Sequence, residues 1–283
     1  MPKGWITGAG GVIGNYLFQT APASVPEWEV SGLTRGQLDL LDFDAVRRFF
    51  AQEKPQLVIH CAALTKTPAC QENPTLARKL NIEATRLLAE LAADIPFVFF
   101  STDLVFDGRK GNYVETDQVN PLNVYAETKV AAENIVLQNP RHTVIRTSLN
   151  LGRSPTGDRS FSEEMRRACE TGKTLRLFTD EFRCPIPAVV TAQAVWSLVR
   201  QHESGLYHIA GSERLSRWEI GQLLAVRWPQ FQARLEPASL VDYQGPPRSP
   251  DTSLNCSRAQ KLLPFPLPAL SQWMVTPSAE EQH

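Results

Sequence analysis

Short apolar runs alternate with longer stretches of helical periodicity in the first part of the chain. The apolar runs, each of a length typical of a buried β-strand, cover residues 3–7, 28–34, 56–60, 96–101 and 142–146. The helical stretches between them cover residues 15–19, 42–53, 75–94 and 125–138. Such alternation predicts an α/β fold with a parallel, doubly wound sheet of the Rossmann type.

The pattern changes in the second part of the chain, where prolines become frequent and helical pieces at 161–171 and 218–228 are separated by loops. We therefore expect a main domain at residues 1–150 and a smaller C-terminal lobe. The lobe mainly covers residues 151–274, with segments that return to the main domain. Residues 275–283, Val-Thr-Pro-Ser-Ala-Glu-Glu-Gln-His, predict a flexible tail.

Composition restricts the partners and the compartment more than the chemistry. The 283 residues carry a net charge of −1 without a basic run, which gives no electrostatic basis for binding nucleic acid or a membrane surface. No apolar stretch approaches the length of a membrane span, and no signal peptide precedes the first strand. The five cysteines lack a C-x-x-C pair and the five histidines form no cluster, so we expect reduced thiols in the cytoplasm and no metal site.

A glycine-rich loop, Gly8-Ala-Gly-Gly-Val-Ile-Gly14, follows the first strand at once. Glycines permit a tight turn and a close approach of the backbone to a pyrophosphate, while the start of the next helix supplies free N–H groups. Candidate cofactor-binding residues are therefore Gly8, Gly11, Val12, Ile13 and Gly14. The spacing differs from G-x-G-x-x-G, and an ordinary turn is the alternative for the loop taken alone.

The second predicted strand ends at Arg35, where a dinucleotide fold brings the adenosine ribose. An acidic residue at this place binds the 2′-hydroxyl of NAD, whereas an arginine can pair with the 2′-phosphate of NADP. Arg35 thus favours NADP(H), with NAD(H) still open. A solvated loop arginine is the alternative interpretation.

Tyr125 and Lys129 lie four residues apart on a predicted helix and so share one of its faces. A phenol with the ordinary pKa of about 10 is a poor acid at neutral pH, and a neighbouring ammonium group lowers that pKa. The pair therefore predicts that Tyr125 is a proton donor activated by Lys129. Exposed helices also contain this spacing by chance, so the prediction depends on the agreement of other motifs.

Two further segments follow predicted strands and reach the same edge of the sheet as the glycine loop. They are Cys61-Ala62-Ala63 and Ser101-Thr102-Asp103. Ligands of parallel α/β sheets bind beyond the carboxyl ends of the strands, so the three segments predict one shared site.

Together these motifs resemble an extended short-chain dehydrogenase/reductase. The resemblance is carried by Thr7-Gly-Ala-Gly-Gly-Val-Ile-Gly14, Ser101-Thr-Asp-Leu-Val-Phe-Asp-Gly108, Asn120-Pro-Leu-Asn-Val-Tyr125 and Lys129. Within that superfamily the chain is most similar to the dTDP-4-dehydrorhamnose reductase family, which reduces a 4-keto group on a nucleotide-linked sugar. Similarity is dense over residues 3–150 and thinner beyond them.

The resemblance implies that Thr102, Tyr125 and Lys129 are catalytic. The nicotinamide would give a hydride to the carbonyl carbon while Tyr125 protonates the oxygen, which Thr102 orients, and Lys129 would also bind the nicotinamide ribose. The resemblance also implies that residues 1–150 are the NAD(P)-binding domain. The implied cofactor site further includes Asp39, Leu40, Cys61, Ala62, Ala63, Thr65 and Asn81. The alternative for Asp39 is a turn or helix cap.

The resemblance implies that the substrate is bound by Thr102, Asp103, Leu104, Leu149, Arg183 and Arg248. The two arginines are candidates for binding a diphosphate, although ordinary surface arginines remain the alternative, and Asp103 could instead orient Thr102 or cap a turn. Leu64, Leu104 and Leu149 stand where these reductases commonly have aromatic residues. Sugar rings pack on aromatic faces, so another sugar nucleotide or another carbonyl compound stays open as the substrate.

We therefore predict an NAD(P)-dependent reductase that acts on a keto group of a nucleotide-linked sugar. The alternatives are a nucleotide-sugar epimerase and a non-catalytic NADP-binding regulatory subunit of the same fold, as in methionine adenosyltransferase. A homodimer through the helices 75–94 and 125–138 is left open, because their apolar faces could equally pack on the sheet.

Overall fold

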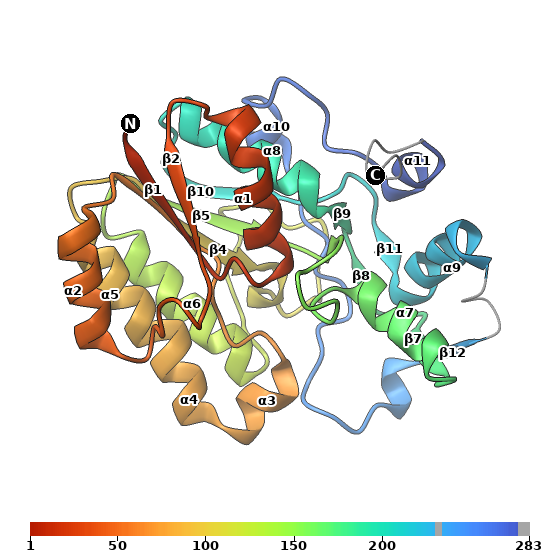
Figure 1. The fold of residues 1–283 in the computed structure, drawn as a ribbon. Coiled ribbons are helices and arrows are strands. Elements are labelled where there is room, and N and C mark those ends of the chain that lie inside the picture. Colours follow the sequence, from red (N-terminus) through yellow and green to blue (C-terminus); the bar gives the residue numbers. More distant parts are fainter. Residues whose placement is uncertain (230–233, 277–283) are drawn as a thin grey trace.

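A parallel sheet of six strands forms the centre of the protein, in the order β10-β5-β4-β3-β1-β2 (Figure 1). The computed structural model describes residues 1–229 and 234–276. The strands are β1 (Lys3–Thr7), β2 (Glu29–Leu33), β3 (Leu57–His60), β4 (Phe97–Thr102), β5 (His142–Thr147) and β10 (Gly205–Ile209). Every pairing in this sheet is parallel. The predicted α/β fold with a doubly wound parallel sheet is therefore confirmed.

Helices cover both faces of the sheet. One face carries α1 (Val12–Ser24) and α8 (Ala188–Arg200), and the other carries α2 (Phe43–Glu53), α5 (Ala84–Leu91) and α6 (Val124–Val136). Strand β4 supplies both cores because its side chains alternate between the faces. Val98 and Phe100 pack toward α1 and α8, whereas Phe97 and Phe99 pack toward the other helices.

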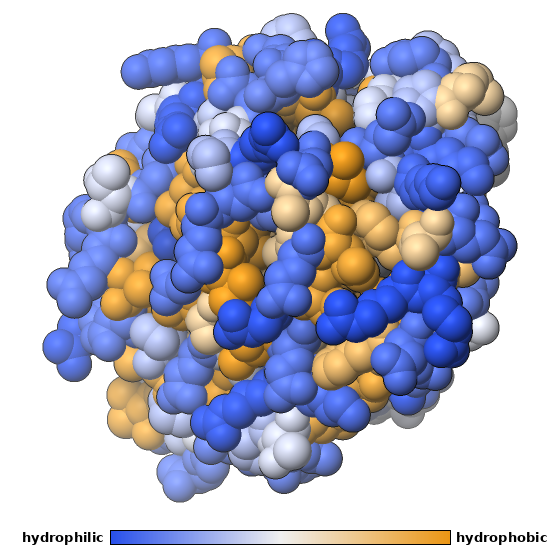
Figure 2. Space-filling view, turned by 90° about the vertical axis from the view of Figure 1, so that its left-hand side faces the viewer, coloured by the Kyte–Doolittle hydropathy of each residue, from blue (hydrophilic) through white to orange (hydrophobic). Residues whose placement is uncertain are grey.

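The face that bears α2 and α5 is turned to the viewer in Figure 2. Hydrophilic side chains cover much of it, and hydrophobic side chains show in the spaces between them. Both helices bury an apolar side against β1 and β3, where Val46 and Leu88 lie in the core. The apolar residues of this region thus serve packing on the sheet, and the homodimer that the sequence left open stays an expectation.

The stretch predicted as a helix over residues 75–94 is helical but not regular. It consists of α4 (Pro74–Arg78), a π-helical turn (Lys79–Glu83) and α5, and a short helix α3 (Thr67–Glu72) precedes it. A π turn inserts an extra residue and redirects the side chains within it. The side chain of the buried Asn81 consequently points at the backbone of Leu64, as described below.

The C-terminal lobe consists of short elements around a core of its own. Its strands pair as β6 (Asn150–Leu151) with β9 (Ile186–Pro187), β7 (Leu175–Phe178) with β12 (Leu235–Ala238), and β8 (Phe182–Arg183) with β11 (Leu215–Ser216). Its helices are α7 (Phe161–Glu170), α9 (Arg217–Arg227), the 3-10 turn η4 (Leu240–Asp242) and α11 (Leu270–Val275). Of the expected tail 275–283, only Val275 and Thr276 lie among the described residues, and Val275 ends α11.

Elements beyond residue 150 also pack on the main sheet, among them α8, β10 and α10 (Ser257–Gln260), whose Ala259 lies in the same core as α1 and α8. Strand β10 pairs with β5, and α8 packs against α1, where Trp196 Nε1 donates a hydrogen bond to the carbonyl of Leu17 at 3.1 Å. Within the described ranges, none of the helices combines the length and the apolar character that crossing a membrane requires.

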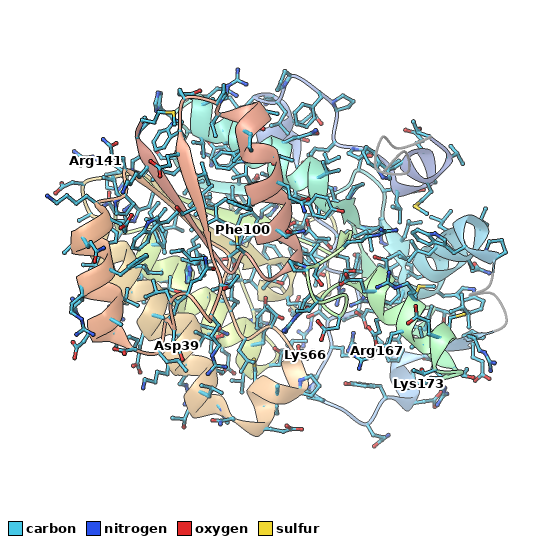
Figure 3. All side chains as sticks on the ribbon, viewed as in Figure 1. Asp39, Lys66, Phe100, Arg141, Arg167 and Lys173 are labelled. Atoms are coloured by element: carbon cyan, nitrogen blue, oxygen red, sulfur yellow. The ribbon has the colours of Figure 1, made fainter. Side chains whose placement is uncertain are left out.

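The lobe also contacts the main domain next to the glycine loop. Asn15 of α1 donates to the carbonyl of Arg153 at 3.3 Å, and the backbone of Arg153 donates to the hydroxyl of Tyr16 at 3.3 Å. The buried carboxylate of Glu163 fixes this loop by accepting hydrogen bonds from the backbone N–H groups of Ser154, Arg159 and Ser160. The hydrogen bond from Thr156 lowers the pKa of Asp158, and Arg159, Lys66 and Arg167 act in the same direction; Figure 3 labels Lys66 and Arg167, which come from the two halves.

Candidate functional site

The glycine loop passes so close to neighbouring backbone that side chains are excluded from it. Gly8 has φ +73°, and a Cβ there would lie 2.6 Å from the amide nitrogen of Ala62. A Cβ on Gly14 would collide with the carbonyl oxygen of Gly8. Gly11 caps α1 without a side-chain hydrogen bond, and Val12 and Ile13 form the first turn. Backbone N–H groups at an uncapped helix start fit the pyrophosphate of a dinucleotide.

Arg35 lies in the loop between β2 and α2, together with Asp39, which Figure 3 labels. The Arg35 side chain is 81% exposed, and its Nε lies 3.5 Å from a carboxylate oxygen of Asp39. The other oxygen of Asp39 accepts a hydrogen bond from the backbone of Leu41, so Asp39 organises the turn, while Leu40 is buried. An exposed ion pair of this kind is weak, so the guanidinium is free to exchange partners.

Asn81 fixes the loop that follows β3. Its side-chain oxygen accepts from the amide of Leu64 at 2.8 Å, and its side-chain nitrogen donates to the carbonyl of Leu64 at 3.1 Å and to the hydroxyl of Thr128 at 2.9 Å. Within this loop Cys61, Ala62 and Ala63 are half-buried, and Thr65 is exposed. Asn81 therefore aligns the loop with α6, and both polar atoms of its side chain already have hydrogen-bond partners within the protein.

Thr102 and Tyr125 are neighbours at the carboxyl end of β4, and Lys129 lies one turn further along α6, over Phe99 of β4. Thr102 is the last residue of β4, and Tyr125 and Lys129 lie on the first two turns of α6, which Asn123 caps by accepting from the amide of Ala126. The Thr102 hydroxyl is near enough to the Tyr125 phenol to lower its pKa. Leu64 and Leu104 pack beside Tyr125, so the phenol sits in an apolar wall with its hydroxyl toward Thr102.

Burial shifts the pKa values of both ionisable members of this group. Burial raises the pKa of Tyr125 strongly, and the nearby Thr102 hydroxyl opposes that shift. Burial also lowers the pKa of Lys129 to about 7, while Glu133 and Cys61 act to raise it. Lys129 Nζ lies 3.9 Å from the centroid of the Phe99 ring, a cation–π contact. The expected lowering of the Tyr125 pKa by Lys129 stays a prediction.

Glu133 and Arg146 were not expected from the sequence as parts of the site. They form a buried ion pair behind Lys129, with Glu133 one helical turn further along α6. The spacing of four between Lys129 and Glu133 was a usable signal, because such residues share a helix face. Arg146 gave no comparable signal, since an arginine inside a predicted buried strand has no local partner in the sequence.

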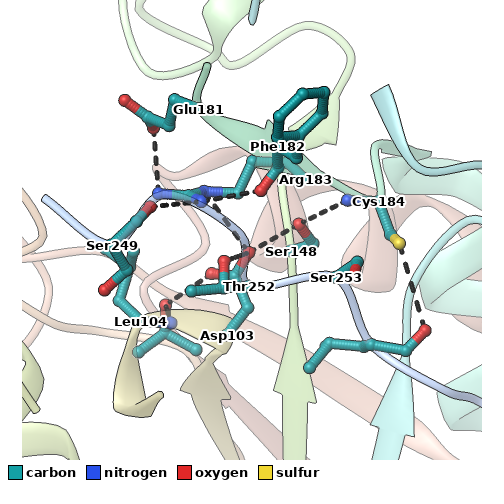
Figure 4. A network of polar contacts seen from close by, with 12 residues as sticks. Asp103, Leu104, Ser148, Glu181, Phe182, Arg183, Cys184, Ser249, Thr252 and Ser253 are labelled. Atoms are coloured by element: carbon teal, nitrogen blue, oxygen red, sulfur yellow. Dashed lines mark hydrogen bonds and ion pairs between the residues drawn. The ribbon is translucent and has the colours of Figure 1, made fainter. Parts of the chain in front are cut away.

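Asp103 is the centre of a network that joins β4 to the C-terminal lobe (Figure 4). Its carboxylate lies 3.2 Å from the Thr102 hydroxyl and accepts hydrogen bonds from Ser148 at 2.7 Å and Thr252 at 3.0 Å. The Nε of Arg183 lies 3.6 Å from the same carboxylate. Asp103 therefore holds Thr102 in place through partners from three other segments of the chain.

The two arginines expected to face the substrate differ in what they offer. Arg183 is 3% exposed, and its nitrogens contact Asp103, Glu181 and the carbonyl of Ser249. The Arg248 side chain is 28% exposed and pairs with the same carboxylate of Glu181. Leu149, a half-buried side chain, packs with the core of the C-terminal lobe. Arg183 thus connects the two halves, and Arg248 keeps part of its guanidinium accessible.

Comparisons with known proteins agree over nearly the whole chain. The family model described as RmlD substrate binding domain matches residues 3–276. A dTDP-4-dehydrorhamnose reductase of Sinorhizobium fredii is 29% identical over 258 residues, covering 86% of this chain and 86% of that protein. The methionine adenosyltransferase 2 subunit beta of Xenopus laevis is 28% identical, covering 91% of this chain and 81% of that one.

Solved structures show the same fold. A hypothetical dTDP-4-dehydrorhamnose reductase from Sulfolobus tokodaii is 31% identical with a TM-score of 0.83, covering 95% of this chain and 97% of that one. A dTDP-4-dehydrorhamnose reductase from Bacillus anthracis, in complex with NADP, has a TM-score of 0.88 at 21% identity, covering 97% and 98% of the two chains. The second likeness concerns the fold alone.

Proposed function

Since the chain belongs to the RmlD substrate binding domain family, we propose that it is an NAD(P)-dependent oxidoreductase that reduces a keto group on a nucleotide-linked sugar. The family membership agrees with the resemblance that its motifs carry. The observation that supports the proposal is the closeness of Thr102, the last residue of β4, to Tyr125 at the start of α6, with Lys129 one turn further along that helix. Ligands of such sheets bind at this edge.

The proposed cofactor is NADP(H), with NAD(H) as the weaker alternative. The glycine loop fits a pyrophosphate, because Gly8 and Gly14 leave no room for a Cβ and Gly11 leaves α1 without a side-chain cap. The exposed guanidinium of Arg35 is available to a 2′-phosphate. A related reductase structure holds NADP, which supports the same choice. Bound nicotinamide would supply the hydride.

The residues of the chain would then bind and protonate the oxygen of the substrate carbonyl. As the carbonyl carbon gains a hydride, its oxygen gains the proton of the Tyr125 hydroxyl. Thr102 would hydrogen-bond that oxygen and hold it near Tyr125, and Asp103 keeps the Thr102 side chain in place. Lys129, when protonated, would stabilise the phenolate that remains on Tyr125.

Replacing Tyr125 with Phe tests this proposal. The variant should lose at least a hundredfold in kcat, because general acid catalysis of this kind contributes roughly 10²–10⁴-fold. Its affinity for NADPH, followed by fluorescence titration, should stay within about twofold, since one hydroxyl is removed and the loop is unchanged. Tyr207→Phe is the matched control, because Tyr207 is a buried tyrosine in β10 whose hydroxyl bonds to Glu203. Full turnover of the Tyr125 variant would reject the assigned role.

A second candidate function is that of a non-catalytic, NADP-binding regulatory subunit. The observation that favours it is the apolar wall beside Tyr125, where Leu64 and Leu104 stand in place of aromatic platforms for a sugar. The similarity to a methionine adenosyltransferase subunit points in the same direction. Oxidation of NADPH with a panel of nucleotide-linked keto sugars separates the two candidates. Binding of NADPH without reduction of any of these compounds would favour the regulatory function.

A further inference from the structure

Buried polar side chains form a continuous series of hydrogen bonds behind the glycine loop. The hydroxyl of Thr7, which ends β1 directly before Gly8, lies 2.7 Å from Nδ1 of His60. The other ring nitrogen of His60, Nε2, lies 3.0 Å from the hydroxyl of Thr85 on α5. That hydroxyl donates to the backbone carbonyl of Asn81 at 2.8 Å. The series therefore runs from the end of β1, through the end of β3, to the π turn.

The series continues from Asn81 to the backbone of Tyr125. The side-chain nitrogen of Asn81 donates to the hydroxyl of Thr128 at 2.9 Å, and that hydroxyl donates to the carbonyl of Tyr125 at 2.7 Å. The Asn81 side chain also bonds to both backbone groups of Leu64, which packs beside the Tyr125 ring. Asn81 thus supports both the ring and the backbone of Tyr125. We refer to the connected residues as the polar path, which consists of Thr7, His60, Thr85, Asn81 and Thr128.

All five residues of the polar path are buried. Each is at most 1% exposed, so solvent does not compete for the contacts between them. Within the described part of the chain, the buried side-chain atoms that lack a partner belong to other residues, and every polar side-chain atom of the path is bonded. A buried polar group that loses its partner is costly, so each residue of the path restricts the orientation of the next.

Every donor of the polar path points in one direction, from the glycine loop toward α6. A threonine hydroxyl has one proton, and that of Thr85 is donated to the Asn81 carbonyl. Thr85 therefore accepts from His60, which places the ring proton on Nε2 and leaves Nδ1 to accept from Thr7. Burial lowers the pKa of His60 to about 3, so the ring carries only this one proton at neutral pH.

We propose that the polar path positions Tyr125 relative to the glycine loop, with His60 and Thr128 as positioning residues. In the proposed reaction the glycine loop would hold the dinucleotide at one end of the path, and Tyr125 would give its proton at the other. Both groups must reach the same carbonyl, so their separation has to be fixed. This inference rests on the proposed function and assigns a role to residues that are buried behind the site.

Thr128→Val tests the last contact of the polar path. Valine has nearly the shape of threonine but no hydroxyl, so the Tyr125 carbonyl loses its side-chain donor, while Asn81 keeps its bonds to Leu64. We expect kcat for a nucleotide-linked keto sugar to fall roughly tenfold to a hundredfold, the effect of a small misplacement of a reacting group. KM and the affinity for NADPH should stay within about twofold. Thr128→Ser keeps the hydroxyl and should recover most of the lost kcat.

Thr143→Val is the matched control. Thr143 is a buried threonine of β5 whose hydroxyl also donates to a backbone carbonyl, that of Glu203 at 2.9 Å. Its substitution should lower the free energy of unfolding in urea about as much as Thr128→Val does, but leave kcat within about twofold of the wild type. Equal losses of kcat in the two valine variants, or full kcat in Thr128→Val, would overturn the positioning role.

The tautomer of His60 tests the direction of the polar path without any substrate. In protein labelled with ¹⁵N-histidine, a protonated and a bare ring nitrogen have clearly different NMR shifts, and the His60 signals are those that His60→Gln removes. The wild type should carry the proton on Nε2. Thr85→Val removes the acceptor of that proton and should shift the ring toward the Nδ1 form. A wild-type ring with its proton on Nδ1 would contradict the path as described.

A second label follows Tyr125 itself. Tyrosine with ¹³C at its carbonyl carbon gives five signals, and Tyr125→Phe identifies the one that belongs to position 125. Thr85→Val acts through Asn81 and Thr128 and should shift this signal, whereas Thr143→Val should not. An unshifted signal in Thr85→Val would overturn the inference. If the signal shifts but the wild type reduces no nucleotide-linked keto sugar, the reductase function fails while the positioning of Tyr125 stands.

Discussion

Glu133 and Arg146 form a two-point ion pair in the interior, with Glu133 Oε1 3.0 Å from Arg146 Nε and Oε2 2.7 Å from Nη2. Glu133 lies on α6 and Arg146 on β5, and both side chains are buried. The pair fixes α6 against the sheet one turn beyond Lys129. It also places a negative charge on the same face of the helix as the Lys129 ammonium.

Removal of the Glu133 carboxylate should destabilise the fold strongly. Glu133→Ala leaves Arg146 charged and unpaired in the core, so we expect the free energy of unfolding to fall by about 3–5 kcal/mol. Urea denaturation measures this change. Glu53→Ala removes the partner of an exposed pair with Lys3 and should cost less than about 1 kcal/mol. Losses of similar size in the two variants would mean that the buried pair contributes no more to the free energy of unfolding than the exposed pair does.

The pH dependence of catalysis should report on Lys129. Its pKa of about 7 means that the ammonium is lost as the pH rises through neutrality, so kcat/KM for reduction should decrease above about pH 7. Glu133 on α6 is the carboxylate that opposes the effect of burial on the Lys129 pKa at neutral pH, because burial keeps the thiol of Cys61 after β3 protonated there. Glu133→Gln should therefore move the decrease to lower pH. An identical pH profile in wild type and variant would show that Lys129 does not cause the decrease of kcat/KM at high pH.

Arg35 should determine the preference for NADP(H). Arg35→Ala should weaken NADPH binding by about 1.5–3 kcal/mol, the typical value of a charged hydrogen bond, and leave NADH binding nearly unchanged. Fluorescence titration of both cofactors measures the difference. Arg141→Ala is the control, because Arg141 is an exposed arginine paired with Asp94 just before β5. Equal weakening of NADPH and NADH would mean that Arg35 does not contact a 2′-phosphate.

His60 should make the protein less stable in acid. Its ring is buried between the hydroxyls of Thr7 and Thr85, at 2.7 and 3.0 Å, and burial, aided by Lys129, lowers its pKa to about 3. The unfolded histidine titrates at about 6.5, so the unfolded state binds the extra proton first as the pH falls. The contribution of His60 is complete above pH 6.5 and is lost toward pH 3, at about 1.4 kcal/mol per pH unit.

Urea denaturation of His60→Gln at several pH values between these limits measures this contribution. The variant should show a smaller loss of stability on acidification than the wild type. His202→Asn is the control, since His202 is exposed at the end of α8 and asparagine tolerates its positive φ of 54°. An unchanged slope in the His60 variant would contradict the assignment.

The fold followed from the sequence because local patterns determine it. The strand predicted at residues 142–146 is β5, which extends one residue further, and the helix predicted at 125–138 is α6, which covers residues 124–136. The position of Thr102 at the carboxyl end of β4 also followed, since a predicted strand leads directly up to it. The π turn around Asn81 did not, because its side-chain contact with Leu64 is tertiary.

The environment of the arginines could not be predicted for the same reason. Whether an arginine is accessible depends on carboxylates that are distant in the sequence, as with Arg183 and Asp103, eighty positions earlier in the chain. The pairing of Arg217 with Glu181 was not expected either, because the sequence around Arg217 only indicates a helix start. Charge clusters assembled from several loops leave no periodic signature.

The return of α8 and β10 to the sheet has a consequence for biosynthesis. A nascent chain that ends at residue 150 lacks the sixth strand and the helix that covers Ile6, Leu17 and Ile145. The cofactor half is thus not complete until the ribosome has released the chain beyond β10. Until then an apolar sheet face stays open to chaperones, and a truncated gene product would aggregate rather than bind dinucleotide.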